Sequence, residues 1–431
     1  MTNINLNIPS HWENAKLGEI GEIASGGTPS TKIIEYFEGD IAWITPADLT
    51  KYNKKYIFRG KKNISISGLQ KSSAKLLPIG SVLFSSRAPI GYVVIAANEI
   101  STNQGFKNLI PSKRVFNEYI YYYLKSAKRL AESLASGTTF KEISAKNFAK
   151  IPIPLPPLPE QHRIVAKIEK LFSELDNGIA SLKKAKEQLK VYRQSVLKWA
   201  FEGRLTEDNI EDGILPSNWK MKKIDDICDV VRGGSPRPAG DPKYYNGNIP
   251  FLKVADLTKD NGKFLTSFTY TIKEAGLKKT RQINPNTLII SNSGATLGVP
   301  KICMLQATMN DGIAAFLNLD YRTNQYLYYF WQSKTLELRN INQGAAQPNL
   351  NTAILKNYII PYCDFNEQER VVKKIESRFS VADNLEKTID QSLQQAEALR
   401  QSILKTAFEG KLVPQDPDDE PAEVLLERIK K

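Results

Sequence analysis

The stretch that decides the fold reads EQHRIVAKIEKLFSELDNGIASLKKAKEQLKVYRQSVLKWAFEGRL at residues 160–205. A second copy, EQERVVKKIESRFSVADNLEKTIDQSLQQAEALRQSILKTAFEGKL, occupies residues 367–412. In both copies apolar residues recur at alternating spacings of about three and four, the period of a coiled-coil seam. The stripe is too narrow and too long for a helix lying on a globular domain, so each helix is predicted to pair with the other copy. The predicted seam and partner-contact positions are Ile164, Ile168, Leu171, Leu175, Leu182, Leu189 and Val196 in the first copy, and Val371, Ile375, Phe379, Ile389, Leu399 and Ile403 in the second.

The repeat extends outward from these helices over the whole chain. GGTP at 26–29 returns as GGSP at 233–236, and NQG at 103–105 returns as NDG at 310–312, both at an offset of 207 residues. The helical copies match closely, whereas the regions before them share only short islands of sequence. The two helical segments are therefore expected to have the same function, while the regions before them are expected to have related but different functions.

The region before each helix is predicted to be mixed α/β. Short apolar runs at 82–84, 93–96 and 288–290 predict buried strands, and residues 119–134 and 325–339 predict helices. Loops rich in Gly, Ser, Asn and Pro separate these elements.

A proline-rich segment leads into the first long helix. Residues 151–159 read IPIPLPPLP, which predicts an extended linker because proline suits neither a helix interior nor a central strand. Pro159 suits a helix start and Gly203 a helix stop. The predicted fold class is therefore α+β, with an internal two-fold repeat and two long helices packed as a coiled coil. The predicted boundaries are 1–155 for the first mixed domain, 156–205 for the first long helix, 206–362 for the second mixed domain, 363–412 for the second long helix, and 413–431 for a C-terminal tail.

Charge suggests a polyanionic partner. The 431 residues carry 59 Lys and Arg against 46 Asp and Glu, a formal net charge of +13. Residues 1–207 hold 30 basic and 18 acidic residues, whereas residues 208–431 hold 29 and 28. The surplus therefore lies in the first half of the chain. A merely basic soluble surface is the alternative reading.

Composition argues against several other classes of protein. The three cysteines are scattered and the histidines number two, so neither a zinc site nor a disulfide framework is expected, and a reducing cytoplasm fits. No apolar run approaches the roughly 18 residues of a membrane span, and the first residues do not resemble a secretory signal. A Walker loop, HExxH and GxSxG are all absent, so no active site is expected in this chain.

The remaining candidate is a binding surface made of loops. Arg87 follows the strand at 82–84, and its counterpart by the repeat offset is Gly294. Arginine can read guanine and asparagine can read adenine, although ordinary turn chemistry is the alternative for each loop. The candidate DNA-binding residues are Lys54, Lys55, Arg59, Lys61, Lys62, Ser86, Arg87, Asn103, Gln104, Thr138, Thr139 and Lys141 in the first half, and Arg237, Asn292, Ser293, Asn310, Gln347 and Asn349 in the second.

These motifs together resemble the DNA-specificity subunit of type I restriction–modification systems. The resemblance rests on the EQxR(I/V)V starts at 160–165 and 367–372, the RQS(V/I)LK and AFEG(R/K)L helix ends, and the LVPQDPDDEPA ending at 412–422. Two departures are PYCDF at 361–365, which replaces the second proline-rich lead, and Gly178 within the first seam.

The resemblance implies a non-catalytic, cytoplasmic subunit that binds double-stranded DNA. Each mixed domain would be a target recognition domain that reads one half of a bipartite asymmetric site. The two helices would pack as an antiparallel coiled coil and set the spacing. DNA methyltransferase subunits would dock on this subunit and restriction subunits would join them. S-adenosylmethionine, ATP and Mg²⁺ would belong to those partners, with no cofactor or metal in this chain. A protein-binding coiled-coil scaffold that does not read DNA is the alternative, and a self-contained modification enzyme is a third hypothesis.

Overall fold

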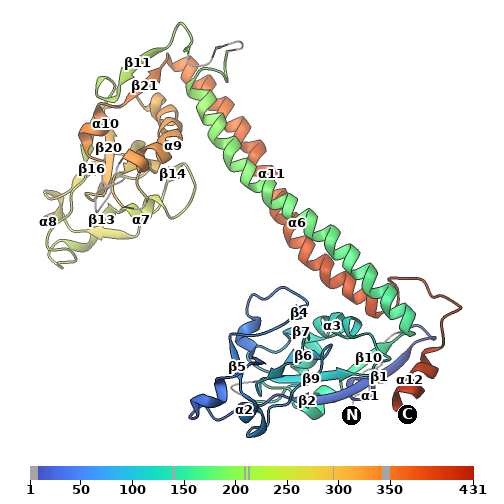
Figure 1. Ribbon diagram of the computed structural model, residues 1–431. Helices are drawn as coiled ribbons and strands as arrows, with labels where there is room; N and C mark the ends of the chain where they lie inside the picture. The colour runs from blue at the N-terminus through green and yellow to red at the C-terminus, as the bar shows by residue number, and fades with distance from the viewer. Residues whose placement is uncertain (1–7, 138–140, 208–209, 212–213, 295, 342–349) are drawn as a thin grey trace. The chain divides into compact units, whose positions relative to one another are not determined.

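The computed structural model describes residues 8–137, 141–207, 210–211, 214–294, 296–341 and 350–431. The chain divides into two compact units, one made of residues 1–182 and 391–431 and the other of residues 183–390. Each unit contains one mixed domain and one half of each long helix (Figure 1). Within the described part of the chain, no helix combines the length and apolarity that a membrane crossing requires.

The two long helices are α6 (Leu158–Phe201) and α11 (Phe365–Phe408), and they pack together in antiparallel directions. In the second unit, Lys186 Nζ lies 2.7 Å from Asp390 Oδ1, and Arg193 Nη2 lies 2.7 Å from Asp383 Oδ1. As the residue number rises along α6, the number of its partner residue on α11 falls. The predicted antiparallel pairing is confirmed within this unit.

The buried line of the helix pair follows most of the predicted seam. Ile164, Ile168, Val196, Val371, Ile375, Ile389 and Ile403 are buried, and Leu171, Leu175, Leu182, Leu189 and Phe379 are half-buried.

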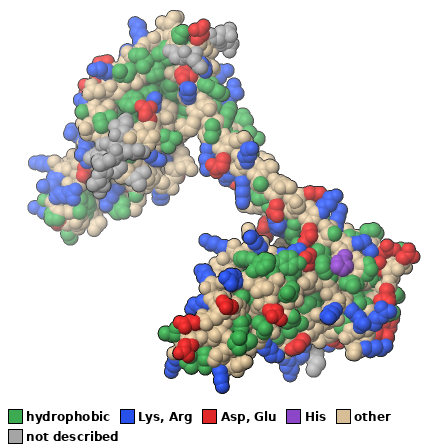
Figure 2. Space-filling model, viewed as in Figure 1, with side chains coloured by type: hydrophobic (Ala, Val, Ile, Leu, Met, Phe, Trp, Pro, Cys, Tyr) green, Lys and Arg blue, Asp and Glu red, His purple; other side chains and the backbone are tan. Residues whose placement is uncertain are grey.

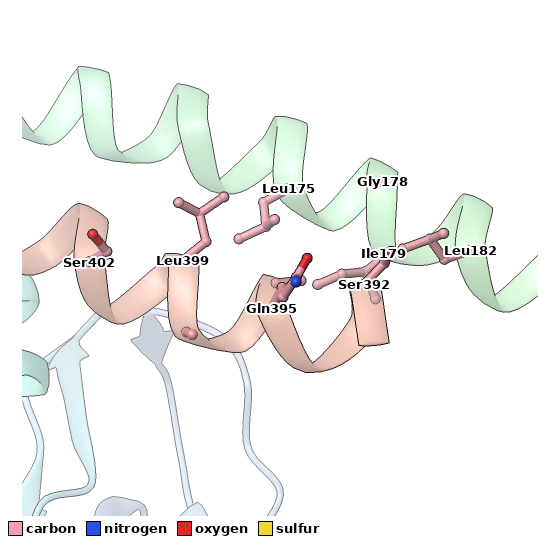
Figure 3. Close-up of a pocket in the computed structure, with 10 residues that line it drawn as sticks. Leu175, Gly178, Ile179, Leu182, Ser392, Gln395, Leu399 and Ser402 are labelled. Carbon is pink, nitrogen blue, oxygen red and sulfur yellow. The ribbon is translucent and has the colours of Figure 1, made fainter. Parts of the chain in front are cut away.

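Leu399 departs from the prediction, since it is 49% exposed. It lines a groove of about 540 Å³ with Leu175 and Ile179 beside Gly178 (Figure 3). An added Cβ at Gly178 would meet nothing within 4 Å, so the glycine leaves the seam unfilled at this level. Leu399 and Gly178 line the same open groove, so this part of the seam is not closed by side chains.

The first mixed domain contains a five-stranded sheet and a three-stranded sheet. Helix α3 (Asn117–Ser126) contacts the β6 and β7 strands of the larger sheet. The predicted helix at 119–134 is interrupted at Ala127, after which α4 (Lys128–Ser133) begins. In spatial order the larger sheet has β2 (Gly21–Ser25), β9 (Phe106–Pro111), β6 (Val82–Ser85), β7 (Val93–Ala96) and β4 (Tyr56–Ile57), and the smaller has β5 (Lys62–Ile64), β3 (Ile41–Ile44) and β8 (Ser101–Thr102).

The second mixed domain repeats this order, with one further strand in its smaller sheet. The strands predicted at 82–84, 93–96 and 288–290 are β6, β7 and β17, and the helix predicted at 325–339 lies within α9 (Asn324–Ile341). The internal repeat is therefore structural. The larger sheet has β12 (Asp229–Arg232), β20 (Ile313–Leu317), β17 (Thr287–Ser291), β18 (Pro300–Cys303) and β14 (Phe264–Leu265), and the smaller has β15 (Tyr270–Ile272), β13 (Tyr245–Leu252), β19 (Ala307–Met309) and β16 (Arg281–Ile283).

The proline-rich lead is extended, as predicted, but it is not a free linker. Its residues form β10 (Pro152–Leu155), which pairs antiparallel with β1 (Glu13–Lys16). The equivalent pair in the second unit is β11 (Lys220–Lys223) with β21 (Ile359–Tyr362). A two-stranded ribbon has only edge strands, which is where proline is tolerated. Each ribbon joins the start of a mixed domain to its end.

The core of each mixed domain is completed by the end of a long helix. Phe408 at the end of α11 packs edge-on against Tyr119 and Tyr123 of α3, with ring centroids 5.3 Å and 5.1 Å away. In the second unit, Phe201 at the end of α6 packs against Tyr326 and Phe330 of α9 at 5.1 Å and 5.2 Å. The helix that follows one mixed domain in sequence thus ends in the core of the other.

The C-terminal tail adds a further helix to the first unit only. Helix α12 (Ala422–Lys430) contacts α1 (Leu17–Ile20) and β1. Leu425 is buried there, and Arg163 of α6 holds Asp419 of the tail through a hydrogen bond of 2.6 Å.

The Phe408→Ala variant should lower the free energy of unfolding of the first unit by about 3–5 kcal/mol, since a buried aromatic ring is removed and a cavity remains. Chemical denaturation with limited proteolysis measures this and should place the new cleavages in residues 1–182. Val381→Ala, at a position 55% exposed on the same helix, is the control and should change stability by under about 0.5 kcal/mol. Equal losses in the two variants would contradict the packing described.

Candidate nucleic-acid interface

Loops of the first mixed domain converge at one end of its larger sheet, where β6 ends. The backbone N–H of Ser86 donates to Gly105 O at 2.7 Å, and that of Gly26 donates to Phe106 O at 3.2 Å. The N–H of Ile143 donates to Ser86 O at 3.1 Å. Four segments far apart in sequence, at residues 26, 86, 105–106 and 143, are therefore fixed to one another by backbone hydrogen bonds.

The same frame recurs at the end of β17 in the second mixed domain. The N–H of Asn292 donates to Gly312 O at 2.9 Å, and that of Gly233 donates to Ile313 O at 2.9 Å. The N–H of Leu350 donates to Asn292 O at 2.8 Å. Because the bonding pattern is the same, Asn292 is the structural equivalent of Ser86.

Two glycines allow this close approach. A Cβ on Gly26 would lie 1.9 Å from Asn103 O, and one on Gly233 would lie 2.1 Å from Asn310 O. Asn103 and Asn310 shape the turns that follow, since each Oδ1 accepts the backbone N–H two residues on, at 2.9 Å and 3.2 Å. The predicted binding residues Asn103 and Asn310 thus have a turn-forming role in the structure.

The counterpart of Arg87 is Ser293, which corrects the assignment to Gly294. Ser85 Oγ accepts the N–H of Tyr92, and Ser291 Oγ accepts the N–H of Val299 in the same way. These bonds align the two strand ends and shift the repeat by one residue from the offset used above. The position that holds an arginine in the first mixed domain therefore holds a serine in the second.

The carboxylate of Glu142 binds two cationic side chains, Lys107 and Arg87, at the end of β6. Glu142 Oε1 accepts from Lys107 Nζ at 3.0 Å and from Ser86 Oγ at 3.4 Å, while Glu142 Oε2 accepts from Arg87 Nη1 at 3.3 Å. Lys107 is buried, and the Arg87 side chain is 37% exposed. Two positive charges share one negative charge, so the cluster keeps a net positive charge at the loop end. Among the residues that the structure describes, Arg87 makes one long contact, which leaves most of its donors for another partner.

The second mixed domain has a different polar cluster near its glycine turn. Ser235 Oγ donates to Asp311 Oδ1 at 2.6 Å, and Arg232 Nε donates to Asp311 O at 2.6 Å. The hydrogen bond from Ser235 lowers the pKa of the Asp311 carboxyl, burial opposes that shift, and the charges of Arg232 and Arg237 add to it. Arg237 lies 3.8 Å from Asp311 Oδ2 with its side chain 72% exposed, so it is held loosely.

Residues 51–62 carry basic side chains interleaved with aromatic ones, and the structure divides the basic residues predicted there into exposed and ion-paired ones. Lys54, Arg59, Lys61 and Lys62 are exposed. Lys55 differs, because its ammonium donates to Glu118 at 2.7 Å and also to Glu169. Burial lowers the pKa of Lys55, but the two carboxylates outweigh it and the net shift is upward. The lysine therefore has a structural role that the sequence did not indicate.

The other predicted positions differ in accessibility. Gln104 and Lys141 are exposed, Ser293 is half-buried, and Ser86 and Asn292 are fully buried. Thr138, Thr139, Gln347 and Asn349 lie outside the described residues.

Sequence reasoning missed several members of these clusters. Lys107 and Glu142 belong to no motif, and Glu142 meets Arg87 across a long sequence separation. Ser235 and Asp311 lie within the repeated GGSP and NDG motifs but were not singled out as site residues. The repeat alone could have drawn attention to Asp311, which stands where the first copy has Gln104. On the face shown in Figure 2, basic side chains are interspersed with acidic ones.

The Glu142→Gln variant should lower the free energy of unfolding by about 1–2 kcal/mol, because buried Lys107 loses its charge partner while the side-chain shape is kept. Thermal denaturation measures the change. Glu132→Gln is the control, since within the described part of the chain Glu132 meets only exposed Lys128, at 3.9 Å one helical turn away. An unchanged melting temperature in Glu142→Gln would show that Lys107 does not depend on this carboxylate.

Comparison with known proteins gives a consistent result for sequence and fold. The sequence profile described as "Type I restriction modification DNA specificity domain" matches residues 9–190 and 216–395. The type I restriction enzyme MjaIX specificity subunit of Methanocaldococcus jannaschii is 39% identical over 302 residues, which are 67% of this chain and 68% of that protein.

Two solved structures share the fold. One comes from work on complex assembly and conformational transition of a type I R-M system, with a TM-score of 0.68 at 22% identity over 94% of this chain and 99% of that one. The other is the HsdS subunit from Thermoanaerobacter tengcongensis, with a TM-score of 0.62 at 21% identity over 95% of this chain and 100% of that one.

Proposed function

This chain belongs to the family of type I restriction–modification DNA-specificity proteins, and on that premise we propose that it is the DNA sequence-recognition subunit of such a complex. Each mixed domain acts as a target recognition domain and reads one half of a bipartite, asymmetric DNA site. The helix pair sets the distance between the two half-sites and docks the partner subunits.

The observation that carries this proposal is the contrast between a repeated frame and unlike loop ends. The backbone bonds that fix Ser86 are the same as those that fix Asn292. The charged side chain of Arg87, by contrast, is replaced by Ser293. Two readers of different half-sequences need a common scaffold with different side chains at the surface that meets the bases.

The length of the helix pair supports its role as a spacer. Each long helix has 44 residues, which at about 1.5 Å per residue corresponds to roughly 66 Å. One turn of duplex DNA is about 34–36 Å, so this length corresponds to nearly two turns. The half-site separation should follow the length of these helices.

Catalysis is assigned to partner subunits. DNA methyltransferase subunits dock on this chain, and restriction subunits join the assembly. S-adenosylmethionine, ATP and Mg²⁺ serve those partners. The helix pair offers apolar surface for docking, since Trp199 is 39% exposed, Val191 is 66% exposed and Leu399 lies in the groove beside Gly178.

Exchange of residues 1–155 for the equivalent segment of another family member should change one half of the methylated motif and leave the other half intact. Genome-wide mapping of methylated adenines, with and without the gene and with the exchanged gene, measures this. Loss of both half-sequences in a folded protein would contradict separate readers. A motif that persists without the gene would favour the protein-binding scaffold instead.

The Arg87→Ala variant, assembled with its methylase, should relax recognition in one half-site by about 1–3 kcal/mol and leave folding intact, if the guanidinium contacts a guanine edge. Binding to a panel of half-site variants at two salt concentrations measures this. A uniform loss of affinity across the panel would instead assign Arg87 to a phosphate. Unchanged affinity and preference would remove Arg87 from the interface.

A further inference from the structure

A lysine at the edge of the second mixed domain is bonded to a long helix. Lys263 lies next to β14, and its Nζ donates to Glu376 Oε1 of α11 at 2.6 Å and to Gln325 Oε1 of α9 at 2.7 Å. Tyr329 Oη of α9 donates to the same Glu376 oxygen at 3.4 Å. Strand edge, domain helix and long helix thus meet at one carboxylate.

The first unit contains the same arrangement. Lys55 lies next to β4, and its Nζ donates to Glu169 of α6 and to Glu118 of α3. Tyr122 Oη of α3 donates to Glu169 Oε1 at 3.3 Å. Tyr122 and Glu169 stand at the offset of 207 from Tyr329 and Glu376, and Glu118 takes the place of Gln325. Lys55 and Lys263 differ by 208 residues, and each directly precedes the equivalent strand, β4 or β14. The arrangement is therefore built twice.

In the second unit these contacts continue to the other long helix. The ring of Tyr329 meets Phe379 of α11 edge-on, with centroids 6.0 Å apart. The Arg193 guanidinium of α6 lies over Phe379 at 5.4 Å and donates to Asp383 of α11 at 2.7 Å. The mixed domain is thereby tied to both members of the helix pair.

The first unit again shows the equivalent contacts. Tyr122 meets Phe172 of α6 edge-on at 5.9 Å, and the Arg400 guanidinium of α11 lies over Phe172 at 5.1 Å. Arg400 also pairs with Asp176 of α6. We call these two networks the joints: the first joint is Lys55, Tyr122, Glu169, Phe172 and Arg400, and the second joint is Lys263, Tyr329, Glu376, Phe379 and Arg193.

We propose that the two joints are positioning devices that fix the direction of each recognition domain on the helix pair, and so restrict the protein to one spacing between half-sequences. The inference rests on the proposed function, because it concerns how a bipartite site is measured. Helix length alone sets a distance only if each domain cannot tilt on its helices. One added base pair moves a half-site by about 3.4 Å and about a tenth of a turn, which a domain free to tilt would absorb.

The chemistry of the joints suits positioning better than core stability. Glu169 and Glu376 are 42% and 43% exposed, so each lies at the rim of the packed core. Charge-assisted hydrogen bonds and a ring edge have directional geometry, whereas aliphatic packing does not. The joints keep their side chains in both copies, although Arg87 and Ser293 at the reading end differ.

The test compares Glu376→Ala with wild type in the full chain bound to its methylase. The probes are duplexes that carry both methylated half-sequences at the native spacing and at one base pair more or less. The native-to-altered affinity ratio should fall about three- to tenfold in Glu376→Ala, and preference within each half-sequence should stay unchanged. Glu169→Ala should behave in the same way.

Glu369→Ala is the matched control, because Glu369 lies on the same helix and pairs only with exposed Lys373 at 2.8 Å in the described structure. Its spacing ratio should equal that of wild type. The double variant with Lys263→Glu and Glu376→Lys should restore part of the lost ratio. Tyr329→Phe, which removes one hydroxyl, serves if Glu376→Ala fails to fold.

An unchanged spacing ratio in folded Glu376→Ala or Tyr329→Phe overturns the proposal. A loss of half-sequence preference in these variants also overturns it, since the joints would then act on the reading loops. A wild type that shows no fixed spacing would instead contradict the proposed function itself.

Discussion

The antiparallel pairing of α6 and α11 is the constraint on which the rest of the structure depends. Each long helix carries a narrow line of apolar side chains. Ile168, Ile375 and Ile403 on these lines are buried in the clusters that the helix ends share with the mixed domains. Antiparallel direction brings the end of one helix to the start of the other. Each mixed domain is therefore attached to two helix segments that are remote from each other in sequence.

This pairing explains why the core of each mixed domain includes residues from the far end of a long helix. Phe408 enters the core beside Tyr119, and Phe201 enters the core beside Tyr326, so each core takes side chains from the helix that begins in the other unit. The β1–β10 and β11–β21 ribbons close the start of each mixed domain onto its end. Aromatic packing and strand pairing together make the attachment firm enough for the domain to be oriented.

The two copies of the repeat share some features and differ in others. Features that fix geometry are kept in both copies: the glycine turns at Gly26 and Gly233, the aligned strand ends, and the two joints. Features at the loop ends are not kept, as Arg87 and Ser293 show. A frame must satisfy the same backbone bonds twice, whereas a surface that reads DNA must match a different sequence each time.

The sequence by itself determined the repeat, the two long helices, their pairing, the buried strands and the family, because coiled-coil periodicity and apolar runs are local patterns. It could not show that Leu399 stays exposed beside Gly178, or that residues 152–155 pair with β1. It aligned Arg87 with Gly294, and it did not show that Lys55 bonds Glu118 and Glu169. Only the tertiary structure decided these points, because the partners Glu169 and Glu142 are brought in by contacts between distant segments, and no local pattern encodes a contact between side chains so far apart in the chain.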